Sequence, residues 1–277
     1  MAAQVVSPEV TVIRPTKGWA SLRLRELWAY RELILFLVWR DVKVRYKQTV
    51  LGAAWAVIQP LVMALVLTVI SALAAQPTGD APRFLVYYTA MLPWNLFAKG
   101  LTEGSNSLVA NQRMITKIYF PRLVLPISPV LAGLVDFAIG LAVLVGFLAY
   151  YGIWPTVAVV SLPLFILVAI LSAMGIAFWF SAIDVRYRDV RYAVPLLTQI
   201  WFLATVFVPL SSVPESFQWL YSLNPMVGVV EGFRWALLGD TWSLDPIVWL
   251  SMAIVVVIFV GGLFYFRRAE RVFADMV

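Results

Sequence analysis

The densest group of ionisable side chains lies between Arg40 and Lys47, in the eight residues RDVKVRYK. It contains four bases and one acid, and no further charged residue follows until Asp80. Arginine and lysine bind phosphate oxygens through charge-assisted hydrogen bonds. A basic cluster directly before a long apolar segment therefore predicts contact with anionic lipid headgroups. Two roles follow: an anchor at the membrane surface, or a working surface helix.

A second group of ionisable residues falls within long apolar stretches, and comprises Lys99, Glu103 and Asp136. Charged side chains at membrane depth are rare, face a bundle interior or a cavity, and mark functional sites by default. Asp136 is the deepest, and its expected partners are Lys99 or a hydroxyl group. A purely structural role for these groups is the equal alternative.

Several kinds of chemistry are missing from the chain. It has no cysteine and no histidine, which excludes thiol nucleophiles and the usual zinc and haem ligands. The patterns G-x-x-x-x-G-K-[ST], G-x-S-x-G and H-E-x-x-H do not occur. We therefore predict no catalytic residue, no metal site and no phosphate-binding loop in this chain.

The elements that position these residues are apolar. The 277 residues are 62% hydrophobic and 13% charged, whereas a soluble domain carries about 25% charged residues. The sequence predicts an all-α integral membrane protein whose six transmembrane helices cover residues 51–75, 84–108, 123–150, 156–182, 192–210 and 246–266. The second is the weakest, because Pro93 interrupts it; we expect it to be buried in protein, where neighbouring helices satisfy the carbonyl freed by proline.

Basic residues orient this bundle. Of the 21 lysines and arginines, 18 fall on one side of the six stretches, whereas Arg83 and Arg234 fall on the other. Positively charged connections are cytoplasmic, so both termini are predicted to be cytoplasmic. The net charge of +6 therefore reflects sidedness, and no nucleic-acid partner is expected. Residues 1–20 lack a cleavable signal and read as a cytoplasmic tail, followed by a surface helix (21–48) and the membrane domain (49–277).

The helix before the membrane extends over Leu22 to Lys47, about seven turns. Its apolar residues follow helical spacing, with Arg31 as the one break in the row: Leu24, Leu27, Trp28, Ile34, Leu35, Val38, Val42 and Tyr46. This pattern predicts an amphipathic helix lying in the headgroup boundary. Gly52 is expected to mark the corner at which the chain turns into the bilayer.

Three connections carry further motifs. Residues 111–126 form a short, partly apolar segment between basic residues, which suits a partner's groove; a tight turn packed on the bundle is the alternative. In DVRYRDVRY, from Asp184 to Tyr192, opposite charges alternate, so an ion-paired turn is expected, with a second docking contact as the alternative. Residues 211–245 are rich in aromatic residues and predict short helices in or re-entering the outer leaflet, or else a loosely ordered loop.

The order of these features resembles a known family. The segments RDVKVRYKQTVLGAAWAVIQPLVM, LPWNLFAKGLTEGSNSLVANQRMITKIYFPRLVLP, LVDF, DVRYRDV and LNPMVGVVEGFRWALLGD occur in that order. Together they resemble the membrane subunits of type-2 ABC exporters, and most closely the branch that exports O-antigen, capsule and teichoic acid. The resemblance covers about Leu24 to Arg271 and leaves Met1–Gly18 outside it.

The resemblance implies a bacterial inner-membrane permease that dimerises and pairs with two copies of an ABC ATPase subunit. That partner would bind ATP and Mg²⁺, so no cofactor is expected here; lipids and a lipid-linked glycan complete the expected partners. A lipid diphosphate would be loaded at Arg40, Lys43, Arg45, Tyr46 and Lys47. The ATPase would be coupled through Asn111, Gln112, Arg113, Met114, Ile115, Lys117 and Tyr119.

The resemblance also implies a pore between the two permeases, closed at its outer mouth by re-entrant helices. Polar residues expected in the pore or the membrane are Gln59, Lys99, Glu103 and Asp136. Residues expected at the outer gate are Trp219, Tyr221, Asn224, Pro225, Glu231, Arg234 and Trp235. The alternatives are a type-2 permease for a drug or small lipid, a membrane-embedded glycosyltransferase, and a secondary transporter.

Overall fold

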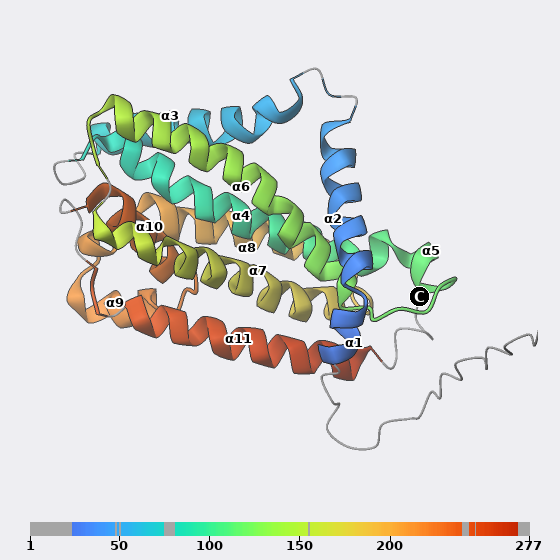
Figure 1. The fold of residues 1–277 in the computed structure, drawn as a ribbon. Coiled ribbons are helices and arrows are strands. Elements are labelled where there is room, and N and C mark those ends of the chain that lie inside the picture. Colours follow the sequence, from blue (N-terminus) through green and yellow to red (C-terminus); the bar gives the residue numbers. More distant parts are fainter. Residues whose placement is uncertain are drawn as a thin grey trace, which may run out of the picture.

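The computed structural model describes residues 24–47, 49, 51–74, 81–154, 156–239, 244–246 and 248–270, and its regular elements in these ranges are helices (Figure 1). The predicted all-α class is therefore confirmed. The predicted tail 1–20 lies outside the described residues. The helices are α1 (Leu24–Ala29), α2 (Arg31–Tyr46), α3 (Trp55–Leu73), α4 (Arg83–Ala110), α5 (Gln112–Ile115), α6 (Val124–Tyr150), α7 (Leu162–Asp184), α8 (Val190–Phe202), α9 (Glu215–Tyr221), α10 (Val227–Leu238) and α11 (Val248–Ala269).

Five of the predicted membrane stretches appear as long apolar helical segments. Among the described residues, segments long and apolar enough to cross a membrane are Gly52–Leu73, Val124–Tyr150, Val157–Asp184, Val190–Phe207 and Val248–Ala269. Their bounds agree with the predicted ones within a few residues. Fewer than half of the residues in each segment are buried inside the protein. The remaining side chains can therefore face lipid.

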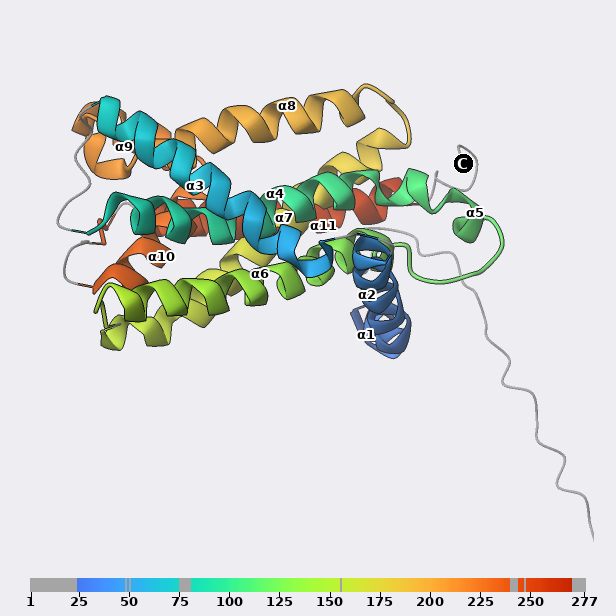
Figure 2. The ribbon, with the colours of Figure 1, turned by 90° about the horizontal axis from the view of Figure 1, so that it is seen from above.

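The remaining predicted stretch is α4, which lies at the centre of the bundle between α6 and α7 (Figures 1 and 2). Eighteen of its 28 residues are buried, Pro93 among them. Protein rather than lipid surrounds this helix, so it tolerates serines, glycines and charged residues that a lipid-facing helix would exclude. The prediction that this segment is buried in protein is confirmed, and burial explains its lower hydropathy.

The N-terminal helix differs from the prediction in two respects. It is broken at Tyr30 into α1 and α2, rather than continuous over seven turns. Its buried face contains Leu37 and packs against α6, with Leu33 and Ile34 partly buried. Trp28 and Leu35, assigned to the same apolar stripe, are 72% and 65% exposed and lie elsewhere. The other described side chains of the stripe are half-buried, so the predicted apolar face is confirmed apart from these two residues: Leu27, Ile34, Val38, Val42 and Tyr46.

Two irregular segments shape the ends of the bundle. Gly52 has a positive φ of 48° and begins the short 3₁₀ turn that leads from α2 to α3, which confirms the predicted corner. Glycine adopts this conformation without steric cost. At the opposite end, α8 continues into a π-helical turn, Leu203–Phe207, before α9 and α10. Helices α1, α2 and α5 thus gather at one end of the bundle, and α9 and α10 at the other (Figure 1).

Candidate functional site

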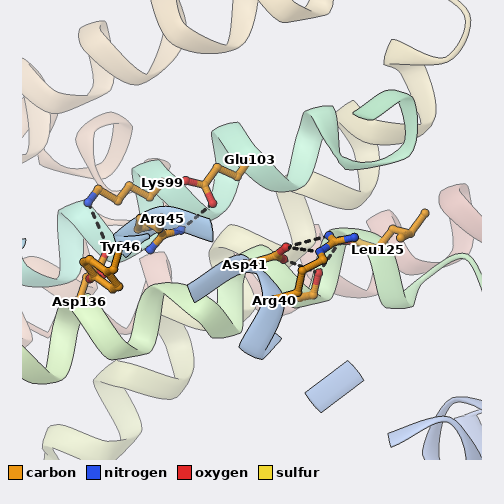
Figure 3. Close-up of polar contacts among 9 residues, drawn as sticks. Arg40, Asp41, Arg45, Tyr46, Lys99, Glu103, Leu125 and Asp136 are labelled. Atoms are coloured by element: carbon orange, nitrogen blue, oxygen red, sulfur yellow. Dashed lines mark hydrogen bonds and ion pairs between the residues drawn. The ribbon is translucent and has the colours of Figure 1, made fainter. Parts of the chain in front are cut away.

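A network of charged side chains joins the end of α2 to the two helices behind it (Figure 3). Arg45 Nη1 lies 2.7 Å from Asp136 Oδ2 on α6, and its Nη2 lies 2.7 Å from Glu103 Oε2 on α4. Lys99 Nζ is 3.1 Å from Asp136 Oδ2. The Tyr46 hydroxyl donates to the other Asp136 oxygen. One arginine therefore bridges two helices, and one aspartate receives three donors.

Burial differs sharply across this network. The side chains of Asp136 and Arg45 are 10% and 19% exposed, whereas that of Glu103 is 43% exposed. The predicted partners of Asp136, Lys99 and a hydroxyl group, are both confirmed. The pKa of the Tyr46 phenol is raised, first by burial and then by its hydrogen bond to Asp136, so the phenol stays protonated and donates. Two cations balance two anions, so the four charged side chains of this five-residue network carry no net charge.

A second polar contact lies one turn earlier on α2. Arg40 donates through Nε and Nη2 to Asp41 Oδ1, at 3.0 and 2.7 Å, and through Nη1 to Asn111 Oδ1 at 3.0 Å. Asp41 Oδ2 accepts a hydrogen bond from the Ser128 hydroxyl at 3.0 Å. Sequence reasoning missed Asp41 and Ser128; the single acid inside the basic cluster was the available signal for Asp41, and none marked Ser128.

A groove of about 510 Å³ opens between these two contacts. Its walls come from α2, α4 and α6, and its lining residues are Arg40, Asp41, Val44, Arg45, Glu103, Ser107, Ala110, Asn111 and Pro129. A smaller cavity of about 20 Å³ adjoins Lys99 and Asp136, behind Pro60 of α3. That volume holds about one water molecule.

The five residues predicted to load a diphosphate are not brought together. Arg40 and Arg45 line the groove and are already paired with carboxylates, and Tyr46 points to Asp136. Lys43 instead stacks its ammonium over the Trp39 ring, 4.4 Å from the ring centroid, and is exposed. Lys47 is also exposed, at the C-terminal end of α2. The unpaired positive charge of the cluster thus lies on the lysines.

The predicted coupling segment surrounds α5 at the same end of the bundle. Gln112, Arg113, Lys117 and Tyr119 are exposed, whereas Met114 and Ile115 pack partly into the core. The Tyr119 hydroxyl lies 3.5 Å from Glu26 Oε1 on α1, and Asn111 binds Arg40 on α2. The segment and the N-terminal helices therefore form one contiguous surface.

The neighbouring turn between α7 and α8 is ion-paired as predicted. Arg191 Nε lies 3.1 Å from Asp184 Oδ1, and the Asp184 side chain is fully buried. Arg186, Tyr187, Arg188 and Asp189 between them are exposed. The ion pair closes the turn and leaves its middle residues accessible. The turn lies at the same end of the bundle as the coupling segment (Figure 2).

The residues assigned to an outer gate converge on the π-helical end of α8. Arg234 Nη1 lies 3.0 Å from Glu231 Oε1, and both side chains are almost fully buried. Arg234 Nη2 also donates to the Val206 carbonyl at 2.8 Å, while Glu231 Oε1 accepts from the Leu210 amide at 3.1 Å. These bonds satisfy main-chain groups that a regular helix would have paired internally.

Two further side chains complete this contact. The Tyr221 hydroxyl donates between the carbonyls of Ala204 and Val208, and Asn224 Nδ2 donates to Thr205 Oγ1 at 2.6 Å. Pro225 follows in the turn to α10, and Trp235 is partly buried on that helix, whereas Trp219 is 57% exposed on α9. The sequence pattern offered no sign that these residues cap the end of α8. Gln59 lies apart from both sites, exposed on the outer face of α3.

Comparison with known proteins identifies the family. The family model described as "ABC-2 type transporter" matches residues 32–238, about three quarters of the chain. The chain belongs to the ABC-2 type transporter family. The match begins in α2 and ends in α10, so it contains both polar sites described above. With its apolar helices, this membership makes the chain a multi-pass protein of the bacterial inner membrane.

Similar proteins come from several bacteria. The chain is 30% identical over 262 residues to the O-antigen export system permease protein RfbA of Myxococcus xanthus, covering 92% of this chain and 98% of the relative. It is 29% identical to the protein of the same name from Klebsiella pneumoniae, over 89% of this chain and 95% of the relative. It is 27% identical to the polysialic acid transport protein KpsM of Escherichia coli, over 85% and 92% respectively.

Proposed function

We propose that this chain is the transmembrane subunit of an ATP-driven exporter that moves a lipid-linked polysaccharide of the O-antigen type across the inner membrane. The observation that carries the proposal is the end-to-end similarity to O-antigen export permeases, which covers 92% of the chain in one relative. Similarity to a polysialic acid transport protein supports the same class of cargo. The chain acts as a transport subunit and not as an enzyme.

The proposed topology has six membrane spans, with α4 as the span that protein surrounds. Helices α2 and α5 lie at the same end of the bundle (Figure 1) and carry basic residues, among them Lys43, Arg45 and Arg113, so this is the cytoplasmic end under the positive-inside rule. Both termini are then cytoplasmic. Helices α9 and α10 lie at the outer end as re-entrant elements, and the Glu231–Arg234 pair holds them against α8.

Energy is supplied by two copies of an ABC ATPase, which bind ATP and Mg²⁺. The absence of a phosphate-binding loop from the sequence supports this division of labour. The contact surface is α5 and the loop after it, where Ile118 and Tyr119 are 62% and 63% exposed, together with the adjoining α1. Exposed apolar side chains beside basic ones suit a groove on a partner protein.

A second copy of the chain completes the pore. Helix α3 leaves Val62, Leu65 and Val69 exposed, and α8 leaves Leu196, Ile200 and Leu203 exposed. At such faces a partner helix or lipid covers the apolar side chains. Gln59, exposed among them on α3, supplies a hydrogen-bonding side chain to a pore between the two copies. The outer gate formed by α9 and α10 then closes that pore.

The substrate's diphosphate is loaded at the cytoplasmic end of α2. Lys43 and Lys47, which are exposed residues, make the first contact at headgroup level. Arg40 and Arg45 in the adjoining groove provide the bidentate donors. Neutralising Arg40, Lys43 and Arg45 is expected to reduce polysaccharide export while assembly with the ATPase continues. Unchanged export would mean that the basic cluster only anchors the helix at the membrane surface.

The test of the function is co-reconstitution of permease and ATPase in liposomes with a lipid-linked glycan on one leaflet. ATP-dependent appearance of the glycan on the other leaflet is expected, and an ATPase-inactive partner is the control. Export of a drug or small lipid instead would support the alternative permease class. Incorporation of sugar from a sugar nucleotide would support a glycosyltransferase. An ATPase gene beside glycosyltransferase genes would independently support the proposal.

A further inference from the structure

The groove beside α2 carries balanced charge, which raises a difficulty for a diphosphate ligand. Arg40 is paired with Asp41, and Arg45 with Glu103 and Asp136. A lipid diphosphate carries a negative charge on each phosphate, so it gains little from a groove whose cations are already neutralised. Binding there requires that a cation change partners. The contacts of each arginine identify which one can do so.

Arg45 has one firmly held and one weakly held partner. Asp136 is 10% exposed and also receives Lys99 and Tyr46, so it keeps two donors when Arg45 leaves. Glu103 is 43% exposed, and among the described residues Arg45 is its sole hydrogen-bond donor. Water reaches this carboxylate, and an exposed ion pair contributes little stability. The Arg45–Glu103 contact is the link that yields at least cost.

The position of Lys99 lowers that cost further. It precedes Glu103 by four residues on α4, so the two side chains share one face of the helix. The Lys99 side chain is 33% exposed and makes its described ion pair with Asp136. When Arg45 turns away, the Lys99 ammonium can serve both carboxylates. In the released state both carboxylates keep a cation nearby, although the network then carries one net negative charge.

We infer that Glu103 is a built-in competitor for the substrate's diphosphate: it holds Arg45 in the unloaded permease and yields it when a lipid diphosphate occupies the groove. The inference rests on the proposed loading function. Loading then breaks the described side-chain contact between α2 and α4, because Arg45 links the two helices there. Substrate binding is thereby transmitted to α2, which adjoins the coupling segment through the Arg40–Asn111 contact. Glu103 thus sets the affinity of the groove for the diphosphate and also the response of α2 to loading.

The test uses the permease–ATPase complex in nanodiscs and farnesyl diphosphate as probe, with farnesol as the reference ligand. Glu103→Gln removes the competing charge and is expected to tighten diphosphate binding about tenfold, since a like charge within about 6 Å of the ligand is lost. Asp189→Asn is the matched control, because it makes the same charge change in the exposed turn between α7 and α8. Arg45→Gln is expected to weaken binding in the wild type and in Glu103→Gln alike.

Amide hydrogen exchange in the complex is the second measurement. If Glu103 had only a structural role, the probe would leave the exchange rate at the end of α2 unchanged. The probe is expected to speed amide exchange in the last turn of α2 in the wild type, whereas Glu103→Gln already exchanges fast without it. If the wild type binds the diphosphate and Arg45→Gln does not, but Glu103→Gln binds no more tightly, the competitor role is wrong and loading stands. If the wild type binds diphosphate no better than farnesol, the loading proposal itself fails.

Discussion

The ion pair between Glu231 and Arg234 offers the sharpest test of how the outer end of the bundle is held. The Arg234 side chain is 0% exposed and that of Glu231 is 6% exposed. Besides each other, they bind the Val206 carbonyl and the Leu210 amide, on either side of the irregular end of α8. We consider the substitution Arg234→Met, which keeps most of the apolar length and removes the charge and the donors.

The expected cost follows from what the substitution leaves behind. Glu231 stays buried without its cation, and removing one partner of a buried pair costs roughly 3–5 kcal/mol. The Val206 carbonyl also loses its arginine donor, which belongs to the same penalty. With about 2–4 °C of melting temperature for each kcal/mol in a domain of this size, the variant is expected to melt about 10 °C below the wild type.

The double substitution Glu231→Gln with Arg234→Met separates charge from packing. The amide oxygen of glutamine can still accept from the Leu210 amide, and no uncompensated charge remains. Replacing a buried pair by neutral groups is often close to neutral in stability, so the double variant is expected to recover at least half of the loss. Melting in detergent, followed by the intrinsic tryptophan fluorescence, measures Arg234→Met, Glu231→Gln and the double variant. A double variant as unstable as the sum of both single changes would refute the reasoning.

The remaining predictions concern packing and polar contacts. In Gly232→Ala the new Cβ overlaps the Phe165 ring, so a loss of about 1–3 kcal/mol in the free energy of unfolding is expected. Gly146→Ala, with nothing within 4 Å of the new Cβ, is the control that should melt like the wild type. Tyr221→Phe deprives two carbonyls of their donor, and amide exchange after the π-helical turn should accelerate by roughly tenfold, for about 1–3 kcal/mol; unchanged exchange would disprove the capping role. Asp136→Asn leaves two cations facing a neutral amide, and a melting temperature several degrees lower is expected; a rise would contradict the network.

Parts of this architecture were accessible from residue order alone. The five apolar helical segments agree with the predicted stretches because length and hydropathy are local properties. The second stretch was also interpreted correctly: Pro93 indicated a helix covered by protein, and α4 is that helix. Lys99 was one of two partners expected for Asp136, the other being a hydroxyl group, and the structure shows both contacts.

Other parts depended on how the helices meet. Arg45 and Asp136 are 91 residues apart in the chain, and their contact exists because α2 crosses α6 at that point. The same crossing divides the basic cluster, turning two arginines toward carboxylates and leaving two lysines outside. No local pattern could distinguish these pairs, because a basic residue before an apolar stretch faces lipid or protein according to the neighbouring helix.

The sequence by itself determined the class of the protein, the position and length of five of its apolar helices, the corner at Gly52 and the absence of a phosphate-binding loop. These follow from the solvent, since every span must satisfy its own backbone and bury apolar side chains. Only the tertiary structure decided the break at Tyr30, which carboxylates hold Arg45 and how the end of α8 is capped. Those choices are set by distances between helices, which the order of residues within one helix does not specify.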